Sequence, residues 1–193
     1  GDPQRGSRVF IPEKDGHRYT SELVAQIVDM NNGRYLEDTL RENTPTSFCI
    51  GVAGYPEKHG EAPNMETDIV NLKKKIDAGA QYIVTQMFFD NGKYFRFRDL
   101  CRDAGIHVPV IPGIKPVSAL NDIKMLPKTF HIDLPNDLVK EVEKCSTDQE
   151  AREVGIEWTT MQSRELISRG APGIHYYTLG RSDNIARIVK ASF

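Results

Sequence analysis

The chain has 193 residues, a formal net charge of −2 and 39% hydrophobic residues, which is the composition of an ordinary globular domain. Its lysines and arginines are interspersed with slightly more acidic residues, so no basic stripe indicates a nucleic-acid partner. The apolar runs are only long enough for strands, and the first residues do not resemble a secretory leader. We therefore expect neither membrane attachment nor secretion.

The three cysteines, Cys49, Cys101 and Cys145, are far apart and show no paired spacing. The sequence therefore predicts neither a disulfide framework nor a metal site, and a reducing, cytoplasmic setting fits best. The chain begins with Gly-Asp-Pro rather than methionine, which indicates a fragment, a processed product or a start further upstream.

Residues 1–193 are predicted to form a single domain, or part of one, because neither repeats nor a low-complexity linker divides them. The pattern turns helical at Thr20, where a Thr-Ser start precedes apolar residues at helical spacing. Strands and helices then alternate along the chain. The further predicted elements are a strand over 48–54, a helix over 66–78, a strand over 82–89, a helix over 93–104, a strand over 108–114, two or three helices between 117 and 169, a strand over 174–179 and a helix after 181.

The predicted strands are apolar on both faces and are separated by helices, which indicates an α/β fold with a parallel sheet. Each strand is followed by a polar cluster, as in a (β/α)8 TIM barrel, whose active site is built from loops at the carboxyl ends of its strands. An open doubly wound sheet is the alternative, but no G-x-G-x-x-G motif follows a strand. Because four clear strands are about half of a barrel, the chain is predicted to be the C-terminal half.

The segment 54–78 combines a strand-end loop with an amphipathic helix. The loop offers an aromatic face and His59, which can hold a flat ring or a nucleotide but is equally typical of a surface loop. In the helix, Ile69, Leu72 and Ile76 form a stripe that faces the core. The opposite face presents the polar residues Asp68, Asn71, Lys74 and Lys75. These four residues are either a solvated face or a set of donors for a ribose and a diphosphate.

Three other strand ends carry candidate residues. Gln86 offers a donor and an acceptor, which suit either a heterocycle such as a pterin or backbone groups at the sheet edge. Lys115 would be a Schiff-base nucleophile if it were desolvated and uncharged. Arg181, after the last predicted strand, is suited to a carboxylate or an aromatic ring.

Several motifs occur in order along the chain, and together they resemble the bacterial type of the methylenetetrahydrofolate reductase family from residue 1 almost to the end. The motifs are Gly54-Tyr-Pro-Glu-Lys-His-Gly-Glu-Ala62, Asp68-x-x-Asn-x-Lys-Lys-Lys-x-Asp-Ala-Gly-Ala80, Ile83-Val-Thr-Gln-Met-Phe-Phe-Asp90, Ile111-Pro-Gly-Ile114 and His175-Tyr-Tyr-Thr-Leu179. The resemblance implies a barrel that binds FAD non-covalently and takes a hydride from NADH or NADPH. The hydride passes to 5,10-methylenetetrahydrofolate to give 5-methyltetrahydrofolate, a reaction of one-carbon metabolism and methionine supply.

The resemblance also implies roles for individual residues. Gln86 matches a glutamine that meets the folate and, in turn, the nicotinamide, and Arg181 matches a folate-contacting arginine. Asp2 would lie near the pyrimidine edge of the flavin and tune it, because a negative charge near N1 disfavours the anionic reduced flavin. The positions that match FAD contacts are Gly1, Asp2, Tyr19, Thr20, Tyr55, His59, Ala62, Asp68, Asn71, Lys74 and Lys75.

The sequence departs from the family pattern at three positions. Gly180 stands where the family has an asparagine before the arginine, and Asp122 and Leu126 stand where some members have a glutamine and a phenylalanine on the folate side. The glutamate that protonates the folate nitrogen belongs to the first strand of the family barrel, so it cannot be in this chain. We therefore expect this fragment alone to be inactive and the parent protein to be a homo-oligomer.

Two alternatives remain. A Schiff-base lyase or aldolase that uses Lys115 would be trapped with a carbonyl substrate by borohydride and would carry no flavin. A non-catalytic fragment or binding module would show neither flavin nor turnover, even with the N-terminal half supplied.

Overall fold

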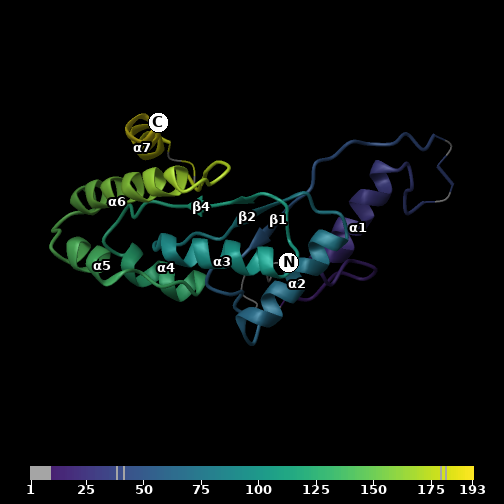
Figure 1. Ribbon diagram of the computed structural model, residues 1–193, viewed down its shortest axis with the longest axis horizontal. Helices are drawn as coiled ribbons and strands as arrows, with labels where there is room; N and C mark the ends of the chain where they lie inside the picture. Colours follow the sequence, from purple (N-terminus) through teal and green to yellow (C-terminus); the bar gives the residue numbers. More distant parts are fainter. Residues whose placement is uncertain (1–9, 38, 41, 179, 181) are drawn as a thin grey trace.

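The structure is a computed structural model that describes residues 10–37, 39, 40, 42–178, 180 and 182–193 (Figure 1). Every element predicted from the sequence is present, and the segment between 117 and 169 forms three helices. The elements are α1 (Thr20–Asn31), β1 (Gly51–Gly54), α2 (Met65–Asp77), β2 (Tyr82–Thr85), α3 (Asn91–Asp103), β3 (Val110–Ile111), β4 (Gly113–Ile114), α4 (Asp122–Phe130), α5 (Asn136–Glu143), α6 (Asp148–Ser168), β5 (His175–Tyr176) and α7 (Asp183–Ser192).

All strand pairs are parallel, and they form one row across the molecule. β1 pairs with β2 and β2 with β3, while β4 pairs with β5. Only Pro112 separates β3 from β4, and proline has no N–H to give to a ladder. Residues 110–114 therefore form one interrupted strand, in which β3 pairs with β2 and β4 pairs with β5.

Side chains hold the sheet together at this interruption. Gly113 N donates to Thr85 Oγ1 at 2.9 Å, and Tyr177 Oη donates to Thr85 O at 2.8 Å. Both Thr85 and Gly113 are buried. Thr85, at the end of β2, thus links the two short sheets with its side chain and its carbonyl group.

The α/β class predicted from the sequence is confirmed, whereas the closed barrel stays a prediction. In the described part of the chain the strands form an open row, and the outer edge of β1 pairs with no strand. The predicted strands were also too long, because the ladder over 82–89 ends at Thr85 and that over 174–179 at Tyr176. None of the helices in the described ranges is long and apolar enough to cross a membrane.

Helices α2, α3 and α6 begin where a side chain satisfies one of their first free N–H groups. Asn64 accepts from Thr67 N at 2.8 Å at the start of α2. At the start of α6, Thr147 Oγ1 accepts from Glu150 N, and the Glu150 carboxylate accepts from Thr147 N, a capping box. These local signals fix the helix starts and so the loops before them.

Two apolar clusters form the core. The first packs α2 and α3 against β1, β2 and β3, and the second joins α4, α5 and α6. Tyr94 of α3 belongs to the first cluster, where it stacks on Phe88 with ring centroids 5.6 Å apart and donates to Val110 O.

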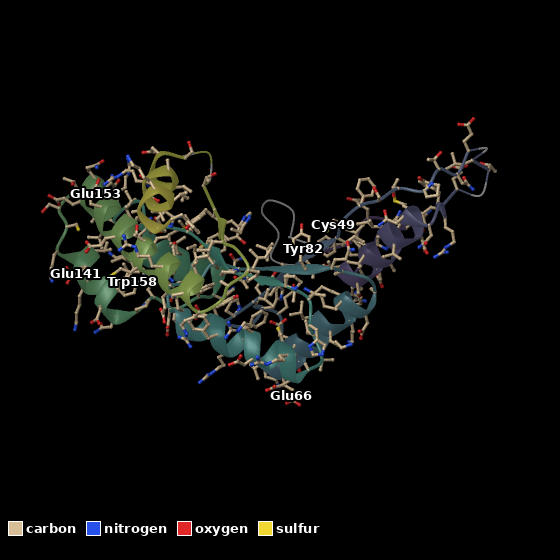
Figure 2. All side chains as sticks on the ribbon, turned by 45° about the horizontal axis from the view of Figure 1, so that its top comes forward. Cys49, Glu66, Tyr82, Glu141, Glu153 and Trp158 are labelled. Atoms are coloured by element: carbon tan, nitrogen blue, oxygen red, sulfur yellow. The ribbon has the colours of Figure 1, made fainter. Side chains whose placement is uncertain are left out.

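The helices cover both sides of the strands. In Figure 1, α6 and α7 lie on one side of the strands and α2 to α5 on the other. Figure 2 shows Glu141, Glu153 and Trp158 at the α5–α6 end, and Cys49 and Tyr82 toward α1.

Helix α6 crosses the segment after β4 at Gly155. A Cβ atom at this position would lie 2.0 Å from Val117 O, well inside contact distance, and both partners are held by secondary structure or core packing. The approach of α6 to the sheet therefore depends on the missing side chain.

We expect Gly155→Ala to lower the free energy of unfolding by about 1–3 kcal/mol or more, because a rigid carbonyl group opposes the added methyl group. Urea denaturation followed by circular dichroism measures the change. Gly173→Ala is the matched control, since nothing lies within 4 Å of its Cβ position, and it should change stability by less than about 0.5 kcal/mol. Equal effects of the two substitutions would contradict the packing described for Gly155.

Candidate functional site

The loop after β1 is held in shape by polar contacts of its own residues. Lys58 has a positive φ of 81°, which is uncommon for a residue with a side chain. Its Nζ donates to His59 O at 3.0 Å and to Ala62 O at 2.6 Å. Ala62 is buried, and its N–H closes the turn by donating to His59 O. The loop is therefore a fixed turn.

Two predicted contact residues meet in this loop. The rings of Tyr55 and His59 lie edge to face, with centroids 4.6 Å apart. Glu61 N donates to His59 Nδ1 at 3.2 Å, so this ring nitrogen acts as an acceptor. The pair presents an aromatic surface at the carboxyl end of β1, the position expected for a site in this type of fold.

Asp68 corrects one expectation from the helical periodicity, because it does not share the solvated face of α2. It is only 9% exposed, and its Oδ2 accepts from His59 N at 2.9 Å. The loop preceding α2 folds back over the first turn of the helix and covers this carboxylate. Asp68 therefore joins the helix to the loop that carries Tyr55 and His59.

Asn71 and Lys74 lie on the exposed face of α2, as the sequence predicted, whereas Lys75 does not. Asn71 and Lys74 are exposed, and Lys74 Nζ donates to Asn71 Oδ1 at 3.1 Å. Lys75 is half-buried and reaches back to β1, where its Nζ donates to Ala53 O at 2.8 Å. Burial lowers the pKa of Lys75, and the negative charge of Asp68 opposes this effect. Lys75 is thus a cation whose charge an added anion would stabilise.

Gln86 lies directly after β2, one strand away from the loop. Its backbone N–H donates to Gly54 O at 2.8 Å, and its side-chain Oε1 accepts from Met87 N at 2.9 Å. The side-chain oxygen of Gln86 therefore already accepts from the next residue, while its NH2 group can donate to another partner. Tyr55 and Gln86 line the same shallow depression, together with Phe130 and His131 from the end of α4.

A second hollow, a cavity of about 210 Å³, opens beside β4 and β5. Lys115 is buried there at 5% exposure, and its Nζ forms an ion pair with Asp122 Oδ2 at 3.1 Å. The same Nζ donates to Pro116 O at 3.2 Å, and Ser118 N donates to Asp122 Oδ2 at 2.8 Å. Lys115 is therefore buried, as the Schiff-base hypothesis required, but its Nζ is held by Asp122.

Sequence analysis missed an ionic network beside the loop. Glu57 accepts a hydrogen bond from Lys93 Nζ of α3, and Lys93 also pairs with Asp133 at 2.6 Å. Glu57 lies inside a motif that was noted, but its partners lie 36 and 76 residues away along the chain. No periodicity or spacing links residues so far apart.

Some predicted residues do not join this group. Gly1, Asp2 and Arg181 lie outside the described residues, so their roles stay predictions. Tyr19 and Thr20 stand at the start of α1, both exposed, and α1 itself packs on α2 (Figure 1). Among the described residues, neither Tyr19 nor Thr20 lines the depression that Tyr55 and Gln86 share. The structure also shows no cluster of three metal-ligating side chains among the residues it describes.

Fold and site together define an α/β protein with polar loops at the carboxyl ends of parallel strands. A sequence model described as methylenetetrahydrofolate reductase matches residues 1–192. A probable methylenetetrahydrofolate reductase (NADPH) from Caenorhabditis elegans is 36% identical over 176 residues, which are 84% of this chain and 26% of the relative. The 5,10-methylenetetrahydrofolate reductase of Salmonella typhimurium is 41% identical over 137 residues, which are 70% of this chain and 46% of the relative.

The chain belongs to the methylenetetrahydrofolate reductase family, as the motifs predicted. It spans less than half the length of the two relatives. Among solved structures, an uncharacterized Clostridium thermocellum protein described as binding two copies of 5-methyl-5,6,7,8-tetrahydrofolic acid has a TM-score of 0.48 and 17% identity, covering 74% of this chain and 51% of that chain. This similarity is too low to indicate a shared fold or ligand.

We expect Asp68→Ala to destabilise the protein by about 1–3 kcal/mol, because it leaves His59 N without its acceptor in a partly buried turn. Urea denaturation measures the loss. Glu66→Ala is the matched control, since Glu66 lies on the same first turn but is exposed (Figure 2), and removal of its charge near the helix N-terminus should cost less than about 1 kcal/mol. If both variants lost the same stability, the link from Asp68 to the loop would be unimportant.

Lys115 is expected not to form a Schiff base, because its ammonium group is paired with Asp122 and an imine requires a neutral amine. The protein is incubated with pyruvate and sodium borohydride, and intact mass and peptide mapping detect adducts. The Lys115→Arg variant gives the background from surface lysines. An adduct at Lys115 above this background would revive the lyase hypothesis.

Proposed function

We propose that the parent protein reduces 5,10-methylenetetrahydrofolate to 5-methyltetrahydrofolate, with FAD as cofactor and NADH or NADPH as hydride donor. In this proposal the chain is the C-terminal portion of a (β/α)8 barrel. The observation that carries it is the family match over residues 1–192, nearly the whole chain. We also propose a cytoplasmic homo-oligomer, as expected from the sequence.

The residues around α2 fit the chemistry of FAD, which combines a flat ring system with ribose hydroxyls and a diphosphate. Lys75 provides the clearest sign of fit, because burial lowers its pKa and a nearby diphosphate would favour the charged form. Lys74 and Asn71 add an exposed ammonium group and an amide on the same helix. Such donors are the groups that bind phosphate and ribose oxygens.

The loop supplies the other part of the proposed cofactor site. Tyr55 and His59 offer an aromatic surface, and the small side chain of Ala62 allows close approach of a ligand to the turn. Asp68 acts through His59, because it holds the backbone of the turn in place. The chemistry that FAD would supply here is hydride transfer between the nicotinamide and the folate.

Gln86 is proposed to orient the substrates. Its Oε1 accepts from Met87 N, which leaves the NH2 group as a donor beside the depression that Gln86 lines. A carbonyl oxygen of the pterin or of the nicotinamide carboxamide would accept from this donor. The same group can thus serve both substrates in turn, as the resemblance implies.

The remaining site residues keep the roles implied by the family. Asp2 is proposed to tune the flavin, Gly1, Tyr19 and Thr20 to contact the cofactor, and Arg181 to bind the folate. The open edge of β1 would pair with the preceding part of the barrel, which would also bring the glutamate that protonates the folate. The pairing of Lys115 with Asp122 weighs against the alternative Schiff-base lyase.

The proposal is tested on the complete protein that contains this chain. Purified protein is expected to carry flavin bands near roughly 450 nm, to be bleached by NADH or NADPH and to be reoxidised by methylenetetrahydrofolate. A comparison of the two nicotinamides identifies the donor. Protein that takes up no FAD, or that is reduced but not reoxidised by the folate, would contradict the proposed function.

Gln86→Ala is expected to lower kcat/KM for the folate by about tenfold, the effect of one hydrogen bond lost in the transition state, without changing FAD binding. Gln81→Ala is the matched control just before the opposite end of β2, where the Gln81 side chain accepts from Ile50 N and its backbone N–H donates to Ile50 O. It should leave both quantities unchanged. A Gln86 variant with normal kinetics would remove this residue from the substrate site.

A further inference from the structure

Glu57 lies in the loop after β1, between the two aromatic residues of the proposed cofactor site. Its side chain is only 8% exposed. One carboxylate oxygen, Oε2, accepts from Lys93 Nζ and from Asp133 N, the latter at 2.9 Å. Lys93 Nζ donates in addition to Asp133 Oδ2 at 2.6 Å. The three residues form one connected network of charges and a backbone N–H group.

The network joins three segments that are distant in the sequence. Glu57 belongs to the loop that carries Tyr55 and His59, and Lys93 belongs to the first turn of α3. Asp133 belongs to residues 130–133, the end of α4 and the connection that follows it, which we call the 130–133 segment. Fixing the Glu57 carboxylate therefore fixes the loop relative to both α3 and this segment.

A second contact shows that the 130–133 segment packs on the same loop. A Cβ atom at Gly60 would lie 2.9 Å from His131 Cδ2, so the loop and the histidine ring are already in close contact. His131 itself ends α4 with a positive φ of 54°. Phe130, His131 and Ile132 then line the depression that Tyr55 and Gln86 share. The position of this segment consequently decides the shape of the depression.

The second oxygen of Glu57 is not explained by folding. Oε1 is buried and has no hydrogen-bond partner among the residues that the structure describes. Burial raises the pKa of Glu57, although Lys93 and the N–H of Asp133 act in the opposite direction. An apolar side chain would avoid this penalty, and buried ion pairs are often no more stable than apolar replacements. A carboxylate at this place therefore points to a role in geometry.

We propose that Glu57 is a positioning residue of the site: through Lys93 and Asp133 it holds the Tyr55–His59 loop against the 130–133 segment and so sets the depression beside Gln86. This inference rests on the proposed function, because the ligands of the depression are those of the reductase. Glu57 acts on them through the loop and the segment. It is required for the affinity of FAD and folate, while the chemical step depends on it little.

The test uses the complete protein and separates stability from geometry. Lys93→Met leaves the buried Glu57 carboxylate without its counter-charge, and Glu57→Gln removes one of the two carboxylates that pair with the partly exposed Lys93, so both single variants should lose stability, the Lys93 variant more. The double variant Glu57→Gln with Lys93→Met removes both charges and should recover part of this stability. The double variant loses both ion pairs of Lys93, so that only the amide oxygen at position 57 can still accept from Asp133 N, and the loop and the 130–133 segment are held less firmly. We therefore expect its Kd for FAD and its KM for the folate to stay raised by about tenfold, with kcat changed by less than about threefold.

Urea denaturation gives the stability, titration of the apoprotein gives the Kd for FAD, and steady-state kinetics separate KM from kcat. The variants Glu153→Gln, Arg187→Met and their combination form the control, since this ion pair joins the exposed faces of α6 and α7 far from the loop. Their Kd and KM should equal those of the unchanged protein. Conservative Lys93→Arg should keep the Kd for FAD close to normal, because the guanidinium group retains the charge.

Two results would overturn the inference. One is a double variant whose Kd and KM return to normal together with its stability, which would make the network purely structural. The other is a set of variants that keep normal Kd and KM despite loss of the network. If the unchanged protein failed to bind FAD, that result would instead contradict the proposed function, and the inference that rests on it would fail as well.

Discussion

Parallel pairing is the constraint on which the rest of the structure depends. Because β1 to β5 all run in the same direction, their carboxyl ends meet at one edge of the row, and the loops that follow them are brought together there. This explains why Tyr55 and Gln86, which follow different strands, line one depression. It also places Lys115 and its cavity after a third strand of the same row. The direction of the strands alone thus brings these polar residues to one edge of the sheet.

The loop after β1 is then shaped by charged side chains that serve the backbone. Lys58 donates to two carbonyl groups of the turn, Asp68 accepts from one of its N–H groups, and Glu57 fastens it to α3. These contacts hold the loop in one conformation. A loop that is already ordered binds a ligand more tightly, because no free energy is spent on ordering it during binding. Lys74 and Asn71, by contrast, are exposed and bond only to each other among the contacts that the structure describes for their side chains.

Local pattern predicted the order of the elements, and the resemblance of the motifs indicated the family, but neither predicted the long-range contacts of the site. Alternating apolar strands and amphipathic helices predicted α2 and α3 within two residues at either end. Helical periodicity placed Asp68 on the polar face, but the loop folds back over it and buries it. The strand over 82–89 was too long because buried Phe88 and Phe89 leave the ladder and pack on helices, where Trp158 Nε1 donates to Phe89 O. Partners such as Asp133 follow only from the fold.

Thr85 shows how the interruption at Pro112 restricts the residue types that the sheet accepts. Its hydroxyl group accepts from Gly113 N and its carbonyl group accepts from Tyr177 Oη, so one residue of β2 bonds both to β4 and to the residue that follows β5. Valine has nearly the same shape as threonine, yet it would leave Gly113 N without an acceptor in a place shielded from water. Threonine is therefore needed at position 85 although valine would fill the same space in the core, because only threonine provides the hydroxyl group that Gly113 N of the neighbouring strand requires.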